Sequence, residues 1–191
     1  MKAFIAVLVL IFGFQSWTKA DDIRDFEIEG MSIGDSALEF FDKKEIEERK
    51  KVGFVYTDKT FFSATFYNKN FFEKYHNVQL HIKANDSKYI IYSVAGKINY
   101  KDNYDECVNE MEKILPELKA LFSEAKFIDD GTEIWTNDKG YKVKTKSYYL
   151  LLSDGGGIAL ECYDQPKEMN IIDGLSIAID SNEIVEFLTV D

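Results

Sequence analysis

The chain has two histidines, His76 and His81, so any imidazole base or imidazole metal ligand must come from this pair. They lie five positions apart, and residues an odd number apart on one strand point to opposite faces of a sheet. If they share a strand, they cannot chelate one metal ion together. His81 shares its predicted face with Gln79 and Lys83, which favours an ordinary surface histidine. We therefore predict no metal site.

Ser36 is the second candidate for chemistry. Gly34-Asp35-Ser36 resembles the N-terminal serine motif of the GDSL-type lipases and esterases. The resemblance implies a serine nucleophile whose base lies in an Asp-x-x-His near the C-terminus, but neither histidine follows an aspartate by three residues. A serine without an adjacent base is a weak nucleophile. We expect no catalytic residue and no cofactor, although catalysis by carboxylates alone stays open because their positions in space are unknown.

Three further clusters are typical of turns. Asp154-Gly155-Gly156-Gly157 precedes a predicted strand, whereas phosphate-binding loops open a helix, so a hairpin turn is expected. The acidic clusters at 102–106 and 129–131 lack the ligand spacing of a calcium loop. Capping and turn formation explain both clusters.

The two cysteines of the mature chain, Cys107 and Cys162, are predicted to form a disulfide. Cys107 belongs to an apolar stripe with helical spacing over 103–123, and Cys162 alternates with Ile158 and Leu160 on one strand face. Both sulfurs should therefore point into a helix–sheet interface. An even cysteine count in an exported protein favours a bridge. A buried pair of free thiols and a reactive thiol are the alternatives.

Two surface features are candidates for partner binding. Phe61 and Tyr67 fall on one face of a predicted strand that also carries rings on its other face, so the strand is either covered twice or presents aromatic side chains to a partner. Lys142, Lys144 and Lys146 line one face of another strand. They either protect an exposed or edge strand from association or recruit an acidic partner.

Apolar periodicity predicts an α+β protein in which helices pack on one face of an antiparallel sheet or sheets. The order of helix followed by strands occurs twice, which raises the hypothesis of two such units in tandem, 21–100 and 101–191. Strands are predicted over 26–28, 54–57, 60–67, 78–84, 88–95, 132–136, 141–152, 158–163 and 175–180, with a weak strand or helix over 184–190.

The predicted helices differ in how strongly they should be buried. The helix over 103–123 carries the apolar stripe and should kink at Pro116. The helix over 43–51 has Ile46 as almost its only apolar residue and should lie on the surface. A capping box at Ser32 and Asp35 predicts one more helix start.

Residues 1–20 have the layout of a secretory signal peptide, which leaves a single domain over 21–191. Its removal takes away Lys2 and Lys19 and moves the net charge from −11 to −13. An acidic protein of this kind is not expected to bind nucleic acid or anionic lipid. No membrane span is expected after cleavage, and the compartment should be the periplasm or the medium.

Phe26–Phe41, with Gly30-Met31-Ser32 before a capped segment, resembles the start of the helical hairpin in small outer-membrane assembly lipoproteins and β-lactamase-inhibitor-like modules. That resemblance implies two short helices on an antiparallel sheet and the binding of other proteins. The whole chain resembles short exported proteins of AT-rich marine alphaproteobacteria, which implies no particular activity. We therefore expect a non-enzymatic module that engages another envelope protein. The alternative is a carrier of a small apolar ligand held between helix and sheet.

Overall fold

The computed structural model describes residues 23–189 with the exception of 52, 54, 55, 57, 58, 68–70, 138 and 170. The predicted signal peptide and most of the strand predicted over 54–57 lie outside the described residues. Within them, the helices are α1 (Lys43–Lys50), α2 (Tyr104–Leu121) and α3 (Asn182–Thr189). The strands are β1 (Phe61–Phe66), β2 (Asn77–Lys83), β3 (Ile91–Asn99), β4 (Lys126–Thr136), β5 (Lys142–Leu151), β6 (Gly157–Asp164) and β7 (Gly174–Asp180).

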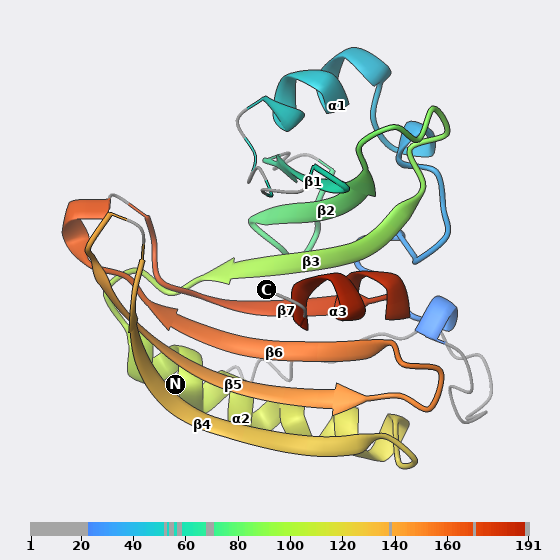
Figure 1. Ribbon diagram of the computed structural model, residues 1–191. Coiled ribbons are helices and arrows are strands. Elements are labelled where there is room, and N and C mark those ends of the chain that lie inside the picture. The colour runs from blue at the N-terminus through green and yellow to red at the C-terminus, as the bar shows by residue number, and fades with distance from the viewer. Residues whose placement is uncertain are drawn as a thin grey trace, which may run out of the picture.

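The described strands form one seven-stranded sheet in the order β1-β2-β3-β7-β6-β5-β4, shown in Figure 1. Every neighbouring pair is antiparallel. The strands before and after α2 join where β3 pairs with β7, so both groups belong to the same sheet. The predicted α+β class is confirmed, whereas an origin in two tandem units stays a hypothesis.

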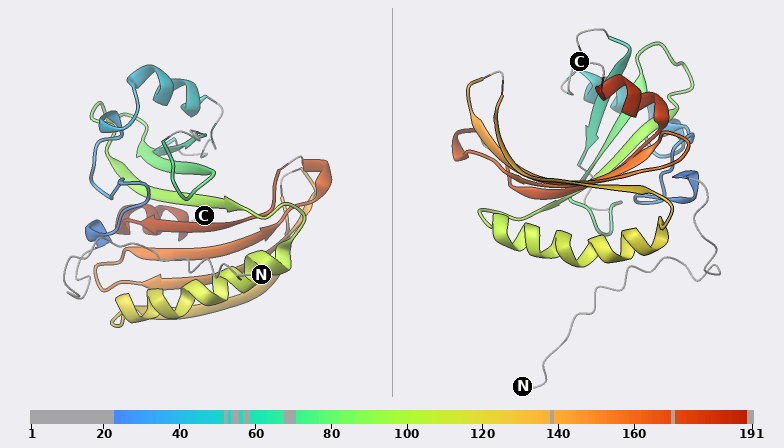
Figure 2. Two further views of the ribbon diagram at one scale, coloured as in Figure 1. Left: turned by 180° about the vertical axis from the view of Figure 1, so that it is seen from behind. Right: turned by 60° about the horizontal axis from the view of Figure 1, so that its bottom comes forward.

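One face of this sheet is apolar and packs against α2. Val78, Leu80 and Ile82 alternate along β2 and are completely buried, as expected for side chains that point to one face. The helix contributes the predicted stripe, with Cys107, Met111, Ile114, Leu115 and Leu118 buried. The sheet curves away from α2, so the opposite face is concave (Figure 2).

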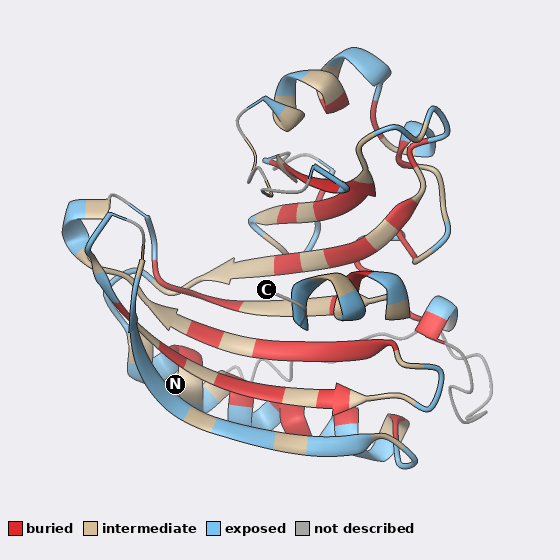
Figure 3. Ribbon diagram, viewed as in Figure 1, coloured by how far each residue is buried: buried red, intermediate tan, exposed pale blue. Residues whose placement is uncertain are grey.

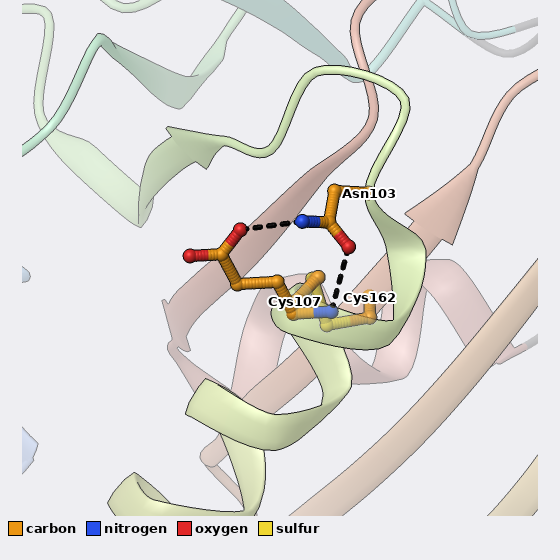
Figure 4. Close-up of a disulfide and its surroundings, with 4 residues drawn as sticks. Asn103, Cys107 and Cys162 are labelled. Carbon is orange, nitrogen blue, oxygen red and sulfur yellow. Dashed lines mark hydrogen bonds between the residues drawn. A yellow bond between two sulfur atoms is a disulfide. The ribbon is translucent and has the colours of Figure 1, made fainter.

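The predicted disulfide joins Cys107 of α2 to Cys162 of β6, with the two Cα atoms 6.0 Å apart. Asn103 fixes the start of α2 just before this bond (Figure 4). Its side-chain oxygen accepts from the Glu106 N–H at 3.2 Å, and its amide nitrogen donates to the Glu106 carboxylate at 2.6 Å. The helix continues through Pro116 to Leu121.

Helix α1 lies at the surface as expected, with its side chains exposed or half-buried except for Ile46, which is buried where the helix packs on β1. One sequence-based expectation about the N-terminal segment is wrong. The helix predicted to begin at Ser32 does not form there. The Asp35 carboxylate does accept from the Ser32 N–H at 2.9 Å. The backbone of Gly34 and Asp35, however, bonds to Ile91 instead of to a helical turn, and a single 3-10 turn follows at Ala37–Glu39.

The concave face is covered only in part. α3 lies on this face (Figure 2), where Phe187 contacts Phe61 with the ring centroids 5.0 Å apart. Strand β4 forms one edge of the sheet and is exposed along most of its length (Figure 3). Among the described helices, none has the length and apolar character that crossing a bilayer requires.

We predict that the Cys107→Ala/Cys162→Ala double variant loses about 4 kcal/mol of unfolding free energy, because the bond closes a loop in the unfolded chain with a sequence separation of 55 residues. Urea titration followed by far-UV circular dichroism measures the change. Reducing agent should destabilise the wild-type protein by a similar amount and leave the double variant unchanged. A loss below about 1 kcal/mol would contradict this role of the bond.

Candidate functional site

The open face of the sheet is polar, and small residues lie at its centre. In one cross-strand row Gln79 pairs with Ala95, which pairs with Ala178, which in turn pairs with Ala159 of β6. In the next row Lys97 pairs with Ser176. Short side chains in the middle of a concave sheet leave a hollow between the longer ones at its sides. Once the strand order is known, the short side chains on adjacent strands indicate a groove at this position.

This hollow is a groove of about 470 Å³. Its described lining comes from five adjacent strands and from the loop before β7, and among these residues it combines amides, hydroxyls and a single charged side chain. The residues are Thr65, Tyr67, Asn77, Gln79, Ala95, Lys97, Asn99, Tyr163, Gln165, Ile171, Ile172 and Ser176. The volume lies within the range of small ligand sites, but the lining is far more polar than the apolar pocket of a lipid carrier.

Two groups in this lining have unused hydrogen-bonding capacity. The side-chain oxygen of Gln165 is buried and has no hydrogen-bond partner among the described residues. Leaving a buried acceptor unpaired costs about 1–3 kcal/mol. Lys97 donates to the Ile172 carbonyl at 3.0 Å, and an ammonium has three donors. The remaining Lys97 donors favour a ligand that carries acceptors, whereas the Gln165 oxygen is enclosed by the protein and does not face the groove openly.

The wall of the groove at β6 is held by a carboxylate. The Glu161 side chain accepts from the hydroxyl of Tyr163, from that of Tyr149 at 3.1 Å and from that of Ser147 at 3.4 Å. Burial and the Glu161 charge raise the pKa of Tyr149 to about 12 and also raise the pKa of Tyr163 well above its ordinary value. Both phenols are therefore neutral donors at physiological pH, and the Tyr163 ring is fixed as part of the lining.

A second polar cluster lies on the same face beside α3. His81 is buried, contrary to the expected surface position, because Tyr56 covers it and its Nε2 lies 2.7 Å from the Tyr56 hydroxyl. Ser93 and Asp180 continue the same cross-strand row. Burial lowers the pKa of His81 to about 4 and raises that of Asp180 to about 6, with a hydrogen bond from Ser93 opposing the second shift.

This row contains the residue types of a nucleophile–base pair but does not present them to a substrate. Only 1% of the Ser93 surface is exposed. The Tyr56 ring lies against Phe187 of α3, with centroids 4.8 Å apart. A serine acts as a nucleophile only where its hydroxyl and a base can both reach the substrate. The cluster therefore stabilises the contact between α3 and the sheet.

The two predicted aromatic binding residues have different environments. Phe61 is buried against Tyr92 and Phe187, so it is unavailable to a partner. Its face of β1 is covered at that point by α3, which is the double coverage that the sequence left open. Tyr67 lies on the same face beyond the helix and is 63% exposed. It belongs to the rim of the groove.

The three predicted lysines do not form a free basic surface. Lys144 lies over the Tyr104 ring, 4.0 Å from its centroid, and Lys146 forms an ion pair with Glu112 of α2. Both therefore hold the helix against β5, and Lys142 alone is exposed. These lysines face α2 whereas Tyr67 faces the concave side, so the two sets of candidates do not form one site.

The remaining candidates have structural roles. The Ser36 hydroxyl donates to the Lys88 carbonyl at 2.6 Å and accepts from the Leu38 N–H, so it caps a short turn. His76 is exposed, and its Nδ1 accepts from the Asn99 N–H at 3.3 Å. The described part of the chain contains no group of three or more His, Cys, Asp or Glu residues placed to hold a metal ion.

Sequence reasoning missed most of the groove. The alternation along β2 places Gln79 on the solvent-facing side of its strand. The alternation of Ala95, Lys97 and Asn99 along β3 likewise indicates one strand face. A polar strand face is, however, the ordinary composition of an exposed sheet surface. What marks these residues as a site is the pairing of β3 with β7, which joins segments about eighty residues apart.

A comparison with protein families, curated proteins and solved structures finds no match for the chain.

We predict that the buried row beside α3 gives two opposite pH dependences of stability. The pKa of Asp180 is about 6 in the folded protein and 3.8 in an unperturbed aspartate, so the contribution of its buried proton to the unfolding free energy is lost as the pH rises from about 4 to 6. Folded His81 resists protonation down to about pH 4, against 6.5, so its contribution is lost as the pH falls through that window.

Each effect is on the order of 2–3 kcal/mol, so they largely cancel in the wild-type protein. In Asp180→Asn only the His81 effect remains, so the unfolding free energy of this variant should increase as the pH rises from 4 to 6.5. In His81→Gln only the Asp180 effect remains, so its unfolding free energy should decrease as the pH rises from 4 to 6. Urea titrations at pH 4, 5, 6 and 7 measure both. The exposed His76→Gln is the matched control. Identical profiles for the wild-type protein and both variants would contradict the assignment.

Proposed function

We propose that this protein is a non-enzymatic binding module of the periplasm or the medium, and that its concave face holds an extended segment of another envelope protein. One observation carries the proposal. The described lining of the groove consists mainly of side-chain amides and hydroxyls, which match the alternating N–H and C=O groups of an extended polypeptide.

The dimensions of the groove favour an extended chain. Its lining comes from β1, β2, β3, β7 and β6. Neighbouring strands are about 4.8 Å apart and an extended residue spans about 3.3 Å, so the groove extends roughly 19 Å and accommodates roughly five or six residues. A polypeptide backbone alternates donors and acceptors, and side-chain amides carry both. Asn77, Gln79, Asn99 and Gln165 supply four such amides.

The rim of the groove supplies apolar contacts for the side chains of the bound segment. Tyr67, Ile171 and Ile172 are 63%, 46% and 45% exposed, respectively. An aromatic ring that combines an apolar body with a hydroxyl is a favoured element of protein interfaces. Arg49 lies 5.9 Å from the Tyr67 ring centroid and orients it. The Tyr67 part of the sequence-based hypothesis is therefore retained, and Phe61 is left out.

Two further features support this reading. The Cys107–Cys162 disulfide is typical of proteins that work in an oxidising compartment. The alternative of a carrier with an apolar ligand between helix and sheet finds less support, because the facing side chains of α2 and the sheet form one packed core. Met111, Leu160 and Leu175 have no exposed surface at all.

We predict that the mature chain selects peptides from a synthetic library of six- to ten-residue peptides with free ends, read by affinity selection and mass spectrometry. Gln79→Ala, which removes an amide from the lining, and Ser176→Tyr, which fills the floor, should each weaken binding of a selected peptide at least tenfold, or about 1.4 kcal/mol. Isothermal titration calorimetry measures the dissociation constants.

The matched control is Lys142→Ala, an exposed position that does not line the groove, and it should change binding less than twofold. Circular dichroism of each variant confirms that the fold is retained. If the library yields no peptide that distinguishes the wild-type protein from Ser176→Tyr, the proposed function is wrong.

A further inference from the structure

Among the described residues, Lys97 is the only charged side chain in the lining of the groove. Its stem crosses Gly174 of β7, where a Cβ atom would lie 2.7 Å from the Lys97 Cε and 2.5 Å from the Ile98 carbonyl oxygen. The glycine therefore leaves the space that the lysine occupies. Because Gly174 pairs with Tyr163 of β6, this places the ammonium group beside the far wall of the groove.

The ammonium group is not matched by a direct acidic partner. The Ile172 carbonyl accepts one of its protons, and within the described residues Lys97 takes part in no ion pair. The nearby Asp173 carboxylate is itself buried and accepts from the Gln165 N–H at 2.8 Å. Burial lowers the pKa of Lys97, and the Asp173 charge opposes this shift. A half-buried cation in this position favours an anionic ligand.

We propose that the groove binds the free C-terminal carboxylate of its polypeptide partner, and that Lys97 is the residue that recognises it. The proposal rests on the proposed function and adds the chemistry of the bound end. A segment that passes Tyr67 and crosses β2 and β3 reaches the ammonium group where the loop of Ile171 and Ile172 borders the groove. A chain that ends there presents a carboxylate to the two remaining Lys97 donors.

The test compares a peptide selected by the wild-type protein in two forms, with a free C-terminal carboxylate and with a C-terminal amide. The amide removes the charge and keeps the rest of the peptide. The wild-type protein should bind the carboxylate form at least tenfold more tightly. Lys97→Met should bind both forms equally, with the affinity that the wild-type protein has for the amide. Calorimetry at 50 mM and 200 mM salt measures each constant.

Two control variants test whether the charge and the position of Lys97 account for the preference. Lys97→Arg retains the charge and should retain at least part of the preference for the carboxylate form. Lys142→Met removes an exposed lysine outside the groove and should retain all of it. Thermal unfolding followed by circular dichroism verifies that each variant is folded at the temperature of the assay.

The possible results separate this inference from the proposed function. If the wild-type protein binds both forms equally while Ser176→Tyr still loses binding, the groove holds a chain interior or a side-chain carboxylate, and the C-terminal proposal is overturned. A preference that survives in Lys97→Met overturns the role of Lys97. If no peptide binds the groove at all, the proposed function fails as well.

Discussion

The structure depends on one constraint: within the described residues, a single long amphipathic helix is available to cover a seven-stranded sheet. A helix stripe can bury one face of a sheet, and here α2 and the N-terminal segment bury the same one. Among the described residues, the eight-residue α3 and Tyr56 cover part of the other face, and the uncovered part must be compatible with water. Its strands meet this requirement by alternating polar with apolar residues. The groove is a direct consequence of that asymmetry.

Covalent and electrostatic contacts fix the helix on its side of the sheet. The disulfide joins α2 to β6, and the ion pair of Lys146 with Glu112 joins it to β5. The Tyr148 hydroxyl donates to the same Glu112 carboxylate at 2.7 Å. The lysine thus neutralises helix charge at its own interface. A positively charged strand in an acidic protein is explained by packing within the chain, so binding to an acidic partner is not needed to account for it.

The concave face of the sheet has two parts, one covered by α3 and one accessible from solvent. Beside α3, Tyr56, His81 and Phe61 are covered by aromatic contacts with the helix or with one another. Beyond α3, Tyr67, Gln79 and Lys97 line the groove. The titratable groups of the closed part influence stability because burial changes their proton affinity. The groups of the accessible part are those that a ligand reaches, which is why the functional proposal rests on them alone.

Much of the fold could be predicted because its signals are local. The helical spacing of Cys107, Met111 and Leu118 predicts α2 and its buried stripe, and the alternation of Val78, Leu80 and Ile82 predicts β2 and its buried face. The cysteine pairing also follows, since both residues lie on apolar faces. The errors occur where a distant contact overrides the local pattern. The segment after Ser32 pairs with β3 instead of forming a helix, and Tyr56 covers His81, which was expected at the surface.

The candidate site could be predicted only in fragments. The sequence by itself determined the long helix, most of the strands with their buried faces and the disulfide, because side-chain periodicity and cysteine count are properties of neighbouring residues. The tertiary structure decided which polar faces adjoin, since the pairing of β3 with β7 brings Lys97 beside Ser176 and Gly174. It also decided that Phe61 is buried and Tyr67 exposed, because α3 covers one part of their shared face and leaves the other open.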